Sequence, residues 1–127
     1  MPPDRCPFCA LPLERIVHQT AHLVAIRDAF PVSPGHTLLI PRRHVVSLLD
    51  VTMVEWVELG QLLVEVRAAL RNEFQPDGFN IGINEGVAAG QTVRHPHLHV
   101  IPRYHGDHPV PDGGVRWVLP EKAKYWP

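Results

Sequence analysis

The sequence predicts an α+β fold, in which an antiparallel sheet is covered on one face by a single long helix. Two observations predict it: the chain contains one strong helical pattern, and runs of strand length lie both before and after that pattern. Strands grouped in this way favour antiparallel pairing, with the helix packed on one face of the sheet. The chain has 127 residues, so we expect a single domain over residues 1–127.

The first part of the chain predicts a lead segment followed by two strands. Residues 1–15 are rich in proline and contain a Cys-Pro-Phe-Cys motif, so we expect them to be extended. Residues 22–28, HLVAIRD, alternate enough to form a strand. A Pro/Gly loop follows at 29–35, and HTLLIP at 36–41 predicts a second, well-buried strand.

A long amphipathic helix is predicted to begin near Thr52. Thr52 and Glu55, three residues later, form a capping box, and Asp50 is a competing cap. The helix should end at residues 75–78, QPDG, because proline and glycine break it. We expect one apolar stripe at helical spacing to pack on the sheet, made of Met53, Trp56, Val57, Gly60, Leu63, Val64, Leu70 and Phe74.

The second half of the chain predicts two more strands and an irregular tail. Residues 79–85, FNIGINE, alternate apolar and polar residues, and HLHVIPR at 97–103 is the next strand. Between them, GVAAG at 86–90 is a loop of small residues. The C-terminal tail, residues 104–127, shows no clear periodicity, although GGVRWVLP within it suggests one short strand.

Composition and charge exclude several classes of protein. The net charge is -1 and the pI is near 6.7, so nothing suggests a nucleic-acid footprint. No run of 18 or more apolar residues is present, so we expect no membrane span. The first residues lack a long apolar segment, so we expect no secretory signal and a cytoplasmic protein. In that compartment, paired cysteines favour a metal or redox site over a structural disulfide.

Three histidines at alternate positions, His95, His97 and His99, are the strongest functional signal. Side chains alternate along a strand, so His97 and His99 should share one face while Leu98 points to the core. Pro96 cannot donate to a ladder and places His95 at the start of the strand. His95 is therefore free to serve a different site from the other two.

Two chemistries fit such a row. Catalytic zinc often takes three protein ligands, but the nearest acidic residues, Glu85 and Asp107, lie well away in sequence. Alternatively, a histidine can act as a nucleophile toward phosphorus, provided that donors surround the phosphate oxygens. The side chains of Asn84, Gln91 and Thr92 would be such donors, and the backbone near Gly86 and Gly90 can approach a phosphate closely.

The motif His-Pro-His-Leu-His-Val-Ile at 95–101 resembles the signature of the histidine triad (HIT) superfamily. Residues 34–45, PGHTLLIPRRHV, resemble a strand and loop of that family, and residues 84–93, NEGVAAGQTV, resemble its phosphate-facing segment. The Cys-Pro-Phe-Cys motif is similar to that of a zinc-binding subgroup common in bacterial members. The tail segment GGVRWVLPEKAKY resembles tails of some members.

The resemblance implies a five-stranded antiparallel sheet with one long helix and a nucleotide hydrolase that acts at the α-phosphate. His97 would attack phosphorus and form a nucleotidyl-histidine intermediate, and water would release a nucleoside monophosphate. His99 would hydrogen-bond the phosphate and the leaving group. The other implied substrate contacts are His36 in support, Asp28 at the ribose, Asn84, Gly90, Gln91 and Thr92 at the phosphate or leaving group, and Phe8, Ile26 and Phe30 around a purine. Members are typically homodimers.

A structural zinc site is expected from four residues: Cys6, Cys9, His44 and His95. Two thiolates and two imidazoles suit a closed tetrahedral site, and the CxxC spacing lets both sulfurs hold one ion. Zinc-bearing branches of the family are similar in this respect. The metal would tie the lead, residues 1–15, to two parts of the sheet.

The sequence is compatible with several functions. The substrate would be a nucleoside phosphoramidate or a dinucleoside polyphosphate, since both present the same α-phosphate. Nucleotidyltransferases related to galactose-1-phosphate uridylyltransferase share the His-Pro-His segment, but they carry glutamine where this chain has His99 and they contain two repeats. The histidine row also fits a nucleotide-binding regulatory module with little turnover, or a hydrolase with catalytic zinc on the three histidines.

Overall fold

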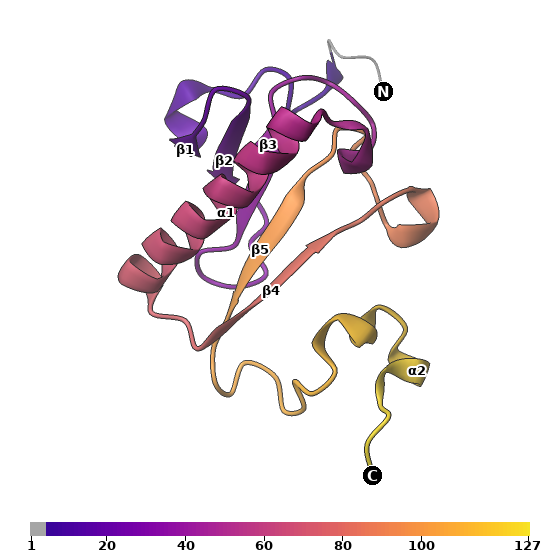
Figure 1. Cartoon of the computed structure of the whole chain (residues 1–127). Helices are drawn as coiled ribbons and strands as arrows, with labels where there is room; N and C mark the ends of the chain where they lie inside the picture. The colour runs from indigo at the N-terminus through magenta and orange to yellow at the C-terminus, as the bar shows by residue number, and fades with distance from the viewer. Residues whose placement is uncertain (1–4) are drawn as a thin grey trace.

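The computed structural model describes residues 5–127, and the first four residues of the expected lead lie outside that range. One sheet has the strand order β1-β2-β3-β5-β4, and every neighbouring pair is antiparallel. This confirms the predicted five-stranded antiparallel sheet and the α+β class (Figure 1). The strands and helices are β1 (Ile16–Gln19), β2 (Leu23–Arg27), β3 (Thr37–Pro41), α1 (Met53–Phe74), β4 (Gly78–Ile83), β5 (Leu98–Arg103) and the short α2 (Pro120–Ala123).

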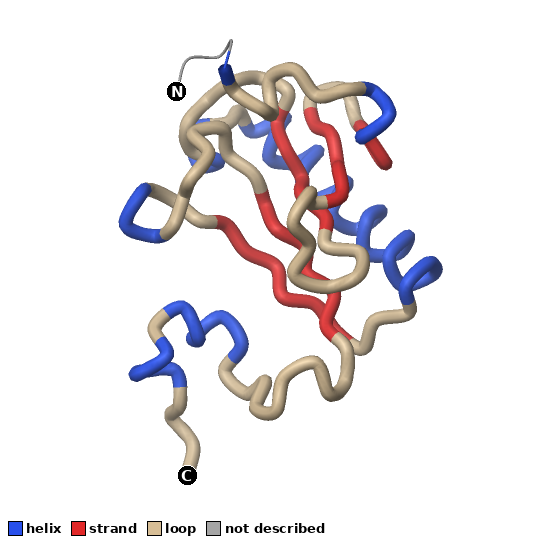
Figure 2. Tube along the Cα trace, turned by 180° about the vertical axis from the view of Figure 1, so that it is seen from behind, coloured by secondary structure: helices blue, strands red, loops and turns tan. Residues whose placement is uncertain are grey.

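The two faces of the sheet have different partners. Helix α1 crosses one face, and the view from behind shows it on the far side of the strands (Figure 2). Its side chains form the larger core with residues such as Leu39 and Val100. On the opposite face, a smaller cluster around Ile26 and Ile40 is covered by Phe8 and Leu11 of the lead. The lead therefore packs on the sheet face that the helix leaves free.

The predicted buried stripe of α1 is largely wrong. Met53 is 74% exposed and Val64 is 60% exposed, whereas Leu63 is half-buried and Leu70 is fully buried. The sheet instead covers a stripe rotated around the helix, made of Leu59, Leu62, Val66 and Leu70. Apolar residues occur on more than one side of this helix, so helical spacing alone is compatible with two different buried stripes. The sheet buries the stripe that contains Leu59 and Leu62.

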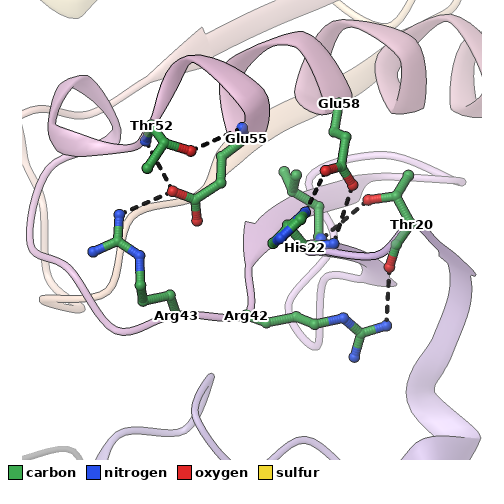
Figure 3. A network of polar contacts seen from close by, with 8 residues as sticks. Thr20, His22, Arg42, Arg43, Thr52, Glu55 and Glu58 are labelled. Carbon is green, nitrogen blue, oxygen red and sulfur yellow. Dashed lines mark hydrogen bonds and ion pairs between the residues drawn. The ribbon is translucent and has the colours of Figure 1, made fainter.

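The start of α1 is confirmed as a capping box (Figure 3). The Glu55 amide donates to the Thr52 hydroxyl over 3.1 Å, and the Thr52 amide donates to the Glu55 carboxylate over 2.8 Å. Arg43 donates to the same carboxylate over 2.9 Å. These bonds, led by the one from Arg43, lower the pKa of the buried Glu55 to about 2. The helix start is thereby tied to the segment that follows β3.

We expect Thr52→Ala to lower the free energy of unfolding by about 1 kcal/mol, because the Glu55 amide loses its acceptor. Urea denaturation of the full chain measures this change. Asp50→Ala is the matched control, since the Asp50 side chain is not the helix cap. Its effect should stay within about 0.5 kcal/mol. Equal losses in the two variants would contradict the assignment of Thr52 as the cap.

A second set of polar contacts joins α1 to the β1–β2 turn (Figure 3). Glu58 accepts the backbone amide of His22 over 3.1 Å and pairs with the His22 ring. Arg42 donates to the Thr20 carbonyl over 3.2 Å, on the other side of the same turn. The turn is thus held from the helix and from the end of β3.

The C-terminal tail lies beyond the edge strand β4 (Figure 1). The short strand suggested within GGVRWVLP is wrong, because Gly114–Val118 form a 3-10 helix. Gly113 and Gly114 both have positive φ, which starts a turn and not an extended strand. Gly114 also lies so close to β4 that a Cβ there would meet the Asn80 amide at 3.1 Å. Neither helix within residues 5–127 is long and apolar enough to cross a membrane.

Candidate active site and metal centre

The alternating histidines divide as the sequence predicts. His95 is fully buried and faces the lead, whereas His97 and His99 are half-buried at the start of β5. Leu98 and Val100 point into the core under α1. The two partly exposed imidazoles therefore lie on the sheet face away from the helix, with ring centroids 5.0 Å apart.

The orientation of His97 is set by the backbone of His95. The Nδ1 of His97 lies 3.0 Å from the His95 carbonyl oxygen. A carbonyl only accepts, so Nδ1 carries the proton and Nε2 keeps its lone pair. This is the tautomer that a nucleophilic histidine requires.

A chain of hydrogen bonds sets the tautomer of His99. The backbone amide of Val32 donates to His36 Nδ1 over 3.0 Å, so a neutral His36 carries its proton on Nε2. That nitrogen lies 2.9 Å from His99 Nδ1 and donates to it. His99 therefore carries its own proton on Nε2. His97 and His99 thus present one lone pair and one N–H donor side by side.

Burial keeps the supporting pair uncharged. Removal from water lowers the pKa of His36. It also lowers the pKa of His99 to about 4, with smaller contributions from nearby His97 and His36. Both imidazoles are accordingly neutral at pH 7, as the hydrogen-bond chain requires.

These shifts predict a pH dependence of stability. The unfolded chain takes up protons below the ordinary histidine pKa of 6.5, while folded His99 resists protonation down to about 4. The unfolded state binds more protons in this window, so the free energy of unfolding should fall as pH drops from 6.5 to 4. Urea denaturation across this range measures the slope. His99→Gln should make the slope shallower, and an unchanged slope would contradict the neutral assignment.

Asp28 lies beside His36 and His99, but the hydrogen bonds of these residues do not suit a metal site. One carboxylate oxygen accepts the Phe30 amide over 2.8 Å, and the other is 3.5 Å from His36 Nε2. Asp28, His36 and His99 have potential ligand atoms within 4.8 Å of one another. However, the Val32 amide already occupies the His36 Nδ1 lone pair, which leaves Nε2 protonated and unable to bind a cation. The contacts therefore favour hydrogen bonding among Asp28, His36 and His99 over a bound metal ion.

The predicted phosphate donors differ in whether their hydrogen-bonding groups are available to a ligand. Gln91 is buried, and its amide donates to the carbonyls of Val46 over 2.8 Å and Val93 over 3.1 Å. Its oxygen accepts the Gly86 amide over 2.9 Å. Both amide hydrogens are thus used to shape the loop, which corrects the expectation that Gln91 offers them to a phosphate. Asn84, Gly90 and Thr92 lie on the same connection, and all three are exposed.

The three residues expected around a purine are placed unequally. Phe8 stands edge-on to His97, with ring centroids 5.2 Å apart, and Ile26 is buried in the same apolar cluster as Phe8. Phe30 is 88% exposed. Phe8 therefore lies beside His97 and covers the apolar cluster that contains the fully buried Ile26, and Phe30 stands outside it.

A pocket of about 440 Å³ opens on the other side of His99. The C-terminal tail supplies part of its wall, through Gly114, Val115, Trp117 and Val118. The lining residues are Val32, His36, Asn80, Ile81, Gly82, Ile83, Asn84, His99, Ile101, Gly114, Val115, Trp117 and Val118. Most of this wall is apolar, so it suits the less polar part of a bound molecule.

The four predicted metal ligands converge, with one donor atom from each within 4.8 Å of the others. His95 Nδ1 lies 3.4 Å from the Cys6 sulfur, 3.5 Å from the Cys9 sulfur and 3.2 Å from His44 Nδ1. Tetrahedral zinc separates such ligands by roughly 3.3 to 3.8 Å, given Zn–N near 2.0 Å and Zn–S near 2.3 Å. His95 Nε2 donates to the Pro41 carbonyl over 2.6 Å, which leaves the Nδ1 lone pair for a metal. The donor set fits zinc.

Comparison with known proteins places this chain. The sequence pattern of the HIT domain matches residues 13–106. The chain belongs to the HIT domain family. Among HIT relatives, a HIT-like protein of Mycoplasma pneumoniae is 37% identical over 80% of this chain and 73% of its own length.

Two further relatives have named activities. A bis(5'-nucleosyl)-tetraphosphatase of Schizosaccharomyces pombe is 37% identical over 83% of this chain and 58% of its own length. An AP-4-A phosphorylase of Mycobacterium tuberculosis is 36% identical over 80% of this chain and 55% of its own length. The chain thus spans little more than half of each of these two proteins.

Solved structures of HIT proteins share the fold. A HIT family protein from Bacillus anthracis has a TM-score of 0.75 and 36% identity, over 82% of this chain and 77% of that one. A zinc-bound histidine triad family protein from Mycobacterium smegmatis has a TM-score of 0.73 and 38% identity, over 84% of this chain and 80% of that one.

Proposed function

We propose that this HIT protein is a nucleotide hydrolase that acts at the α-phosphate through a covalent nucleotidyl-His97 intermediate. The observation that carries the proposal is the pair of opposite tautomers. His97 presents a lone pair on Nε2, while His99, 5.0 Å away between ring centroids, presents an N–H. One group is suited to attack phosphorus and the other to bind the oxygens that gain charge.

In the first step, His97 Nε2 attacks the α-phosphorus and the bond from phosphorus to the leaving group breaks. His99 Nε2–H hydrogen-bonds the phosphate and the departing atom. In the second step, water attacks the same phosphorus, the bond from phosphorus to His97 breaks, and a nucleoside monophosphate leaves. His97 Nδ1–H stays bonded to the His95 carbonyl, which supports the imidazolium that forms after attack.

The remaining site residues hold the substrate in this proposal. The base lies on Phe8, which covers the buried Ile26. The ribose hydroxyls bind Asp28, and Asn84, Gly90 and Thr92 face the phosphate. Gln91 keeps the loop in shape through its bonds to Val46 and Val93. Phe30 is solvent-exposed and contacts the base only if its loop moves over the nucleotide.

We place the leaving group in the 440 Å³ pocket beside His99. Trp117 offers an aromatic surface there, and its indole N–H donates to the Asp112 carbonyl over 2.8 Å, which holds the ring in place. A second nucleoside, or the organic part of a phosphoramidate, matches an apolar wall of this kind.

We expect Trp117→Ala to raise KM for a dinucleoside polyphosphate about tenfold, because stacking on one base is worth roughly 1–3 kcal/mol. KM for a substrate with a small leaving group, such as adenosine 5'-phosphoramidate, should change little. Steady-state kinetics on the two substrates measure the difference. An equal loss for both substrates would place Trp117 outside the leaving-group site.

The test of the proposed activity is a substrate panel with product identification. Nucleoside phosphoramidates and dinucleoside polyphosphates should yield a nucleoside monophosphate. Addition of inorganic phosphate separates hydrolysis from phosphorolysis, the activity named for the M. tuberculosis relative, because phosphorolysis yields a nucleoside diphosphate from the same bond. A flat panel with micromolar nucleotide binding would favour a regulatory module instead.

Zinc in the Cys6, Cys9, His44 and His95 site is proposed as structural, in line with the zinc-binding bacterial-type branch and the zinc-bound M. smegmatis relative. We also propose a homodimer in the cytoplasm. Support for the dimer comes from exposed apolar residues of α1, Met53, Val57 and Val64, together with Ile81 and Ile83 on edge strand β4. Sedimentation of the full chain tests the dimer.

A further inference from the structure

The Cys-Pro-Phe-Cys turn contacts both the metal centre and the nucleophile. Cys6 and Cys9 direct their sulfurs at His95, while Phe8, between them, directs its ring at His97. The Phe8 and His97 centroids are 5.2 Å apart at 70°, and the Phe8 and His95 centroids are 6.0 Å apart at 89°. One short turn therefore supplies two metal ligands and the aromatic neighbour of His97.

His95 links the two sites through three of its atoms. Its Nδ1 faces the cysteine sulfurs, its Nε2 donates to the Pro41 carbonyl, and its carbonyl oxygen accepts the His97 Nδ1–H. A single intervening residue, Pro96, restricts the backbone between the two histidines. Any displacement of His95 is thus transmitted to the acceptor that orients His97.

The turn itself has little regular structure to hold it. Residues 6–9 belong to no strand, and a backbone bond from the Cys9 amide to the Cys6 carbonyl closes the turn at 3.3 Å. Its anchoring comes from Phe8 and Leu11 on the apolar cluster and from the four converging ligands. The Nδ1 atoms of His44 and His95 lie 3.2 Å apart, and His44 Nδ1 lies 3.1 Å from the Cys9 sulfur.

We propose that the metal clasp, Cys6, Cys9, His44 and His95, positions the nucleophile. A bound metal fixes the His95 carbonyl that orients His97 and seats Phe8 against the His97 ring, so the clasp controls the geometry of nucleotide attack and one wall of the base site. This inference rests on the proposed nucleotide hydrolase function. His95 is a positioning residue in it, because it acts on the reaction through His97, whereas Phe8 also contacts the base.

The coupling is measured without turnover. Full-length protein with ¹⁵N-labelled histidine is compared by NMR in zinc-loaded and chelated forms at one pH. The loaded form should show a hydrogen-bonded Nδ1–H for His97, and chelation should remove that resonance while far-UV circular dichroism still shows the folded sheet and helix. Zinc should restore it. A resonance that persists in metal-free protein overturns the proposal, as does unfolding of the whole chain on chelation.

Binding and turnover give the second measurement. Chelation should weaken AMP binding about tenfold and lower kcat/KM about 100-fold, as expected for a reacting group displaced by roughly 1 Å. If no substrate is hydrolysed although the His97 resonance follows the metal, the proposed function fails and the coupling stands. If hydrolysis is found with equal kcat/KM in the two forms, the coupling fails and the function stands.

Phe8→Ala tests the role of Phe8 in the base site while the four metal ligands stay intact. The variant should retain zinc, because both sulfurs and both imidazoles remain, yet bind AMP about tenfold more weakly through loss of one aromatic contact. Leu13→Ala is the matched control, since Leu13 follows in the same chain segment and is 82% exposed. Unchanged AMP affinity in Phe8→Ala overturns the role of Phe8, and so does an equal loss in Leu13→Ala.

Discussion

His97→Ala is expected to abolish hydrolysis at the α-phosphate, with kcat at least about 10⁴-fold below that of the wild-type protein. The variant removes the half-buried imidazole whose Nδ1–H is bonded to the His95 carbonyl and whose Nε2 is free to attack. Single-turnover assays with rapid acid quench measure the loss. Acid quench of the wild-type protein with labelled nucleotide should also trap label on the protein, and the variant should trap none.

His105→Ala is the control, because the His105 side chain is 92% exposed. It should retain full activity. The metal content of His97→Ala distinguishes a nucleophilic His97 from a metal-binding one. If His97 is a nucleophile and not a ligand, the variant should hold as much zinc as the wild type. Loss of zinc together with activity would instead support a catalytic metal on the three histidines.

Cys6→Ser is expected to release the metal and to lower the free energy of unfolding by about 4 kcal/mol, the range in which loss of a metal site falls. Cys6 is buried, and its sulfur lies 3.4 Å from His95 Nδ1, so serine leaves an incomplete ligand set in the interior. Metal analysis and thermal unfolding of the full chain measure both effects.

His44→Ala should act in the same direction, because it removes a second ligand of the same ion. Addition of a chelator should destabilise the wild-type protein but leave Cys6→Ser unchanged. The His105→Ala variant should keep its metal and its stability. Wild-type stability that does not depend on the chelator would contradict a structural metal.

Local patterns in the sequence predicted most of the fold. The alternation in residues 97–103 put His97 and His99 on one face and Leu98 in the core, as the structure confirms. Thr52 and Glu55 predicted the start of α1 because a capping box involves neighbouring residues only. The convergence of four cysteine and histidine residues from distant segments rested on ligand chemistry and family resemblance, and the structure brings them together.

Other features depended on packing and hydrogen-bond partners that could not be read from the sequence. Helix α1 has apolar residues on more than one side, so the predicted stripe followed Met53 and Val64 where the sheet covers Leu59 and Leu62. Gln91 was expected at the phosphate, yet the carbonyls of Val46 and Val93 take both of its amide hydrogens. The tail segment forms a 3-10 helix because, within residues 5–127, no strand pairs with it.

Spacing along the chain fixes hydrophobic period, capping and donor chemistry, so the order of residues was enough to predict the α+β class, the antiparallel sheet, the helix cap and the types of residue at the two sites. The tautomers of the histidines could not be predicted in this way, because each depends on a neighbour in the folded chain. The Val32 amide sets His36, His36 sets His99, and the His95 carbonyl sets His97. A tautomer is chosen by the nearest donor or acceptor in space, and for His99 that partner lies 63 positions away along the chain.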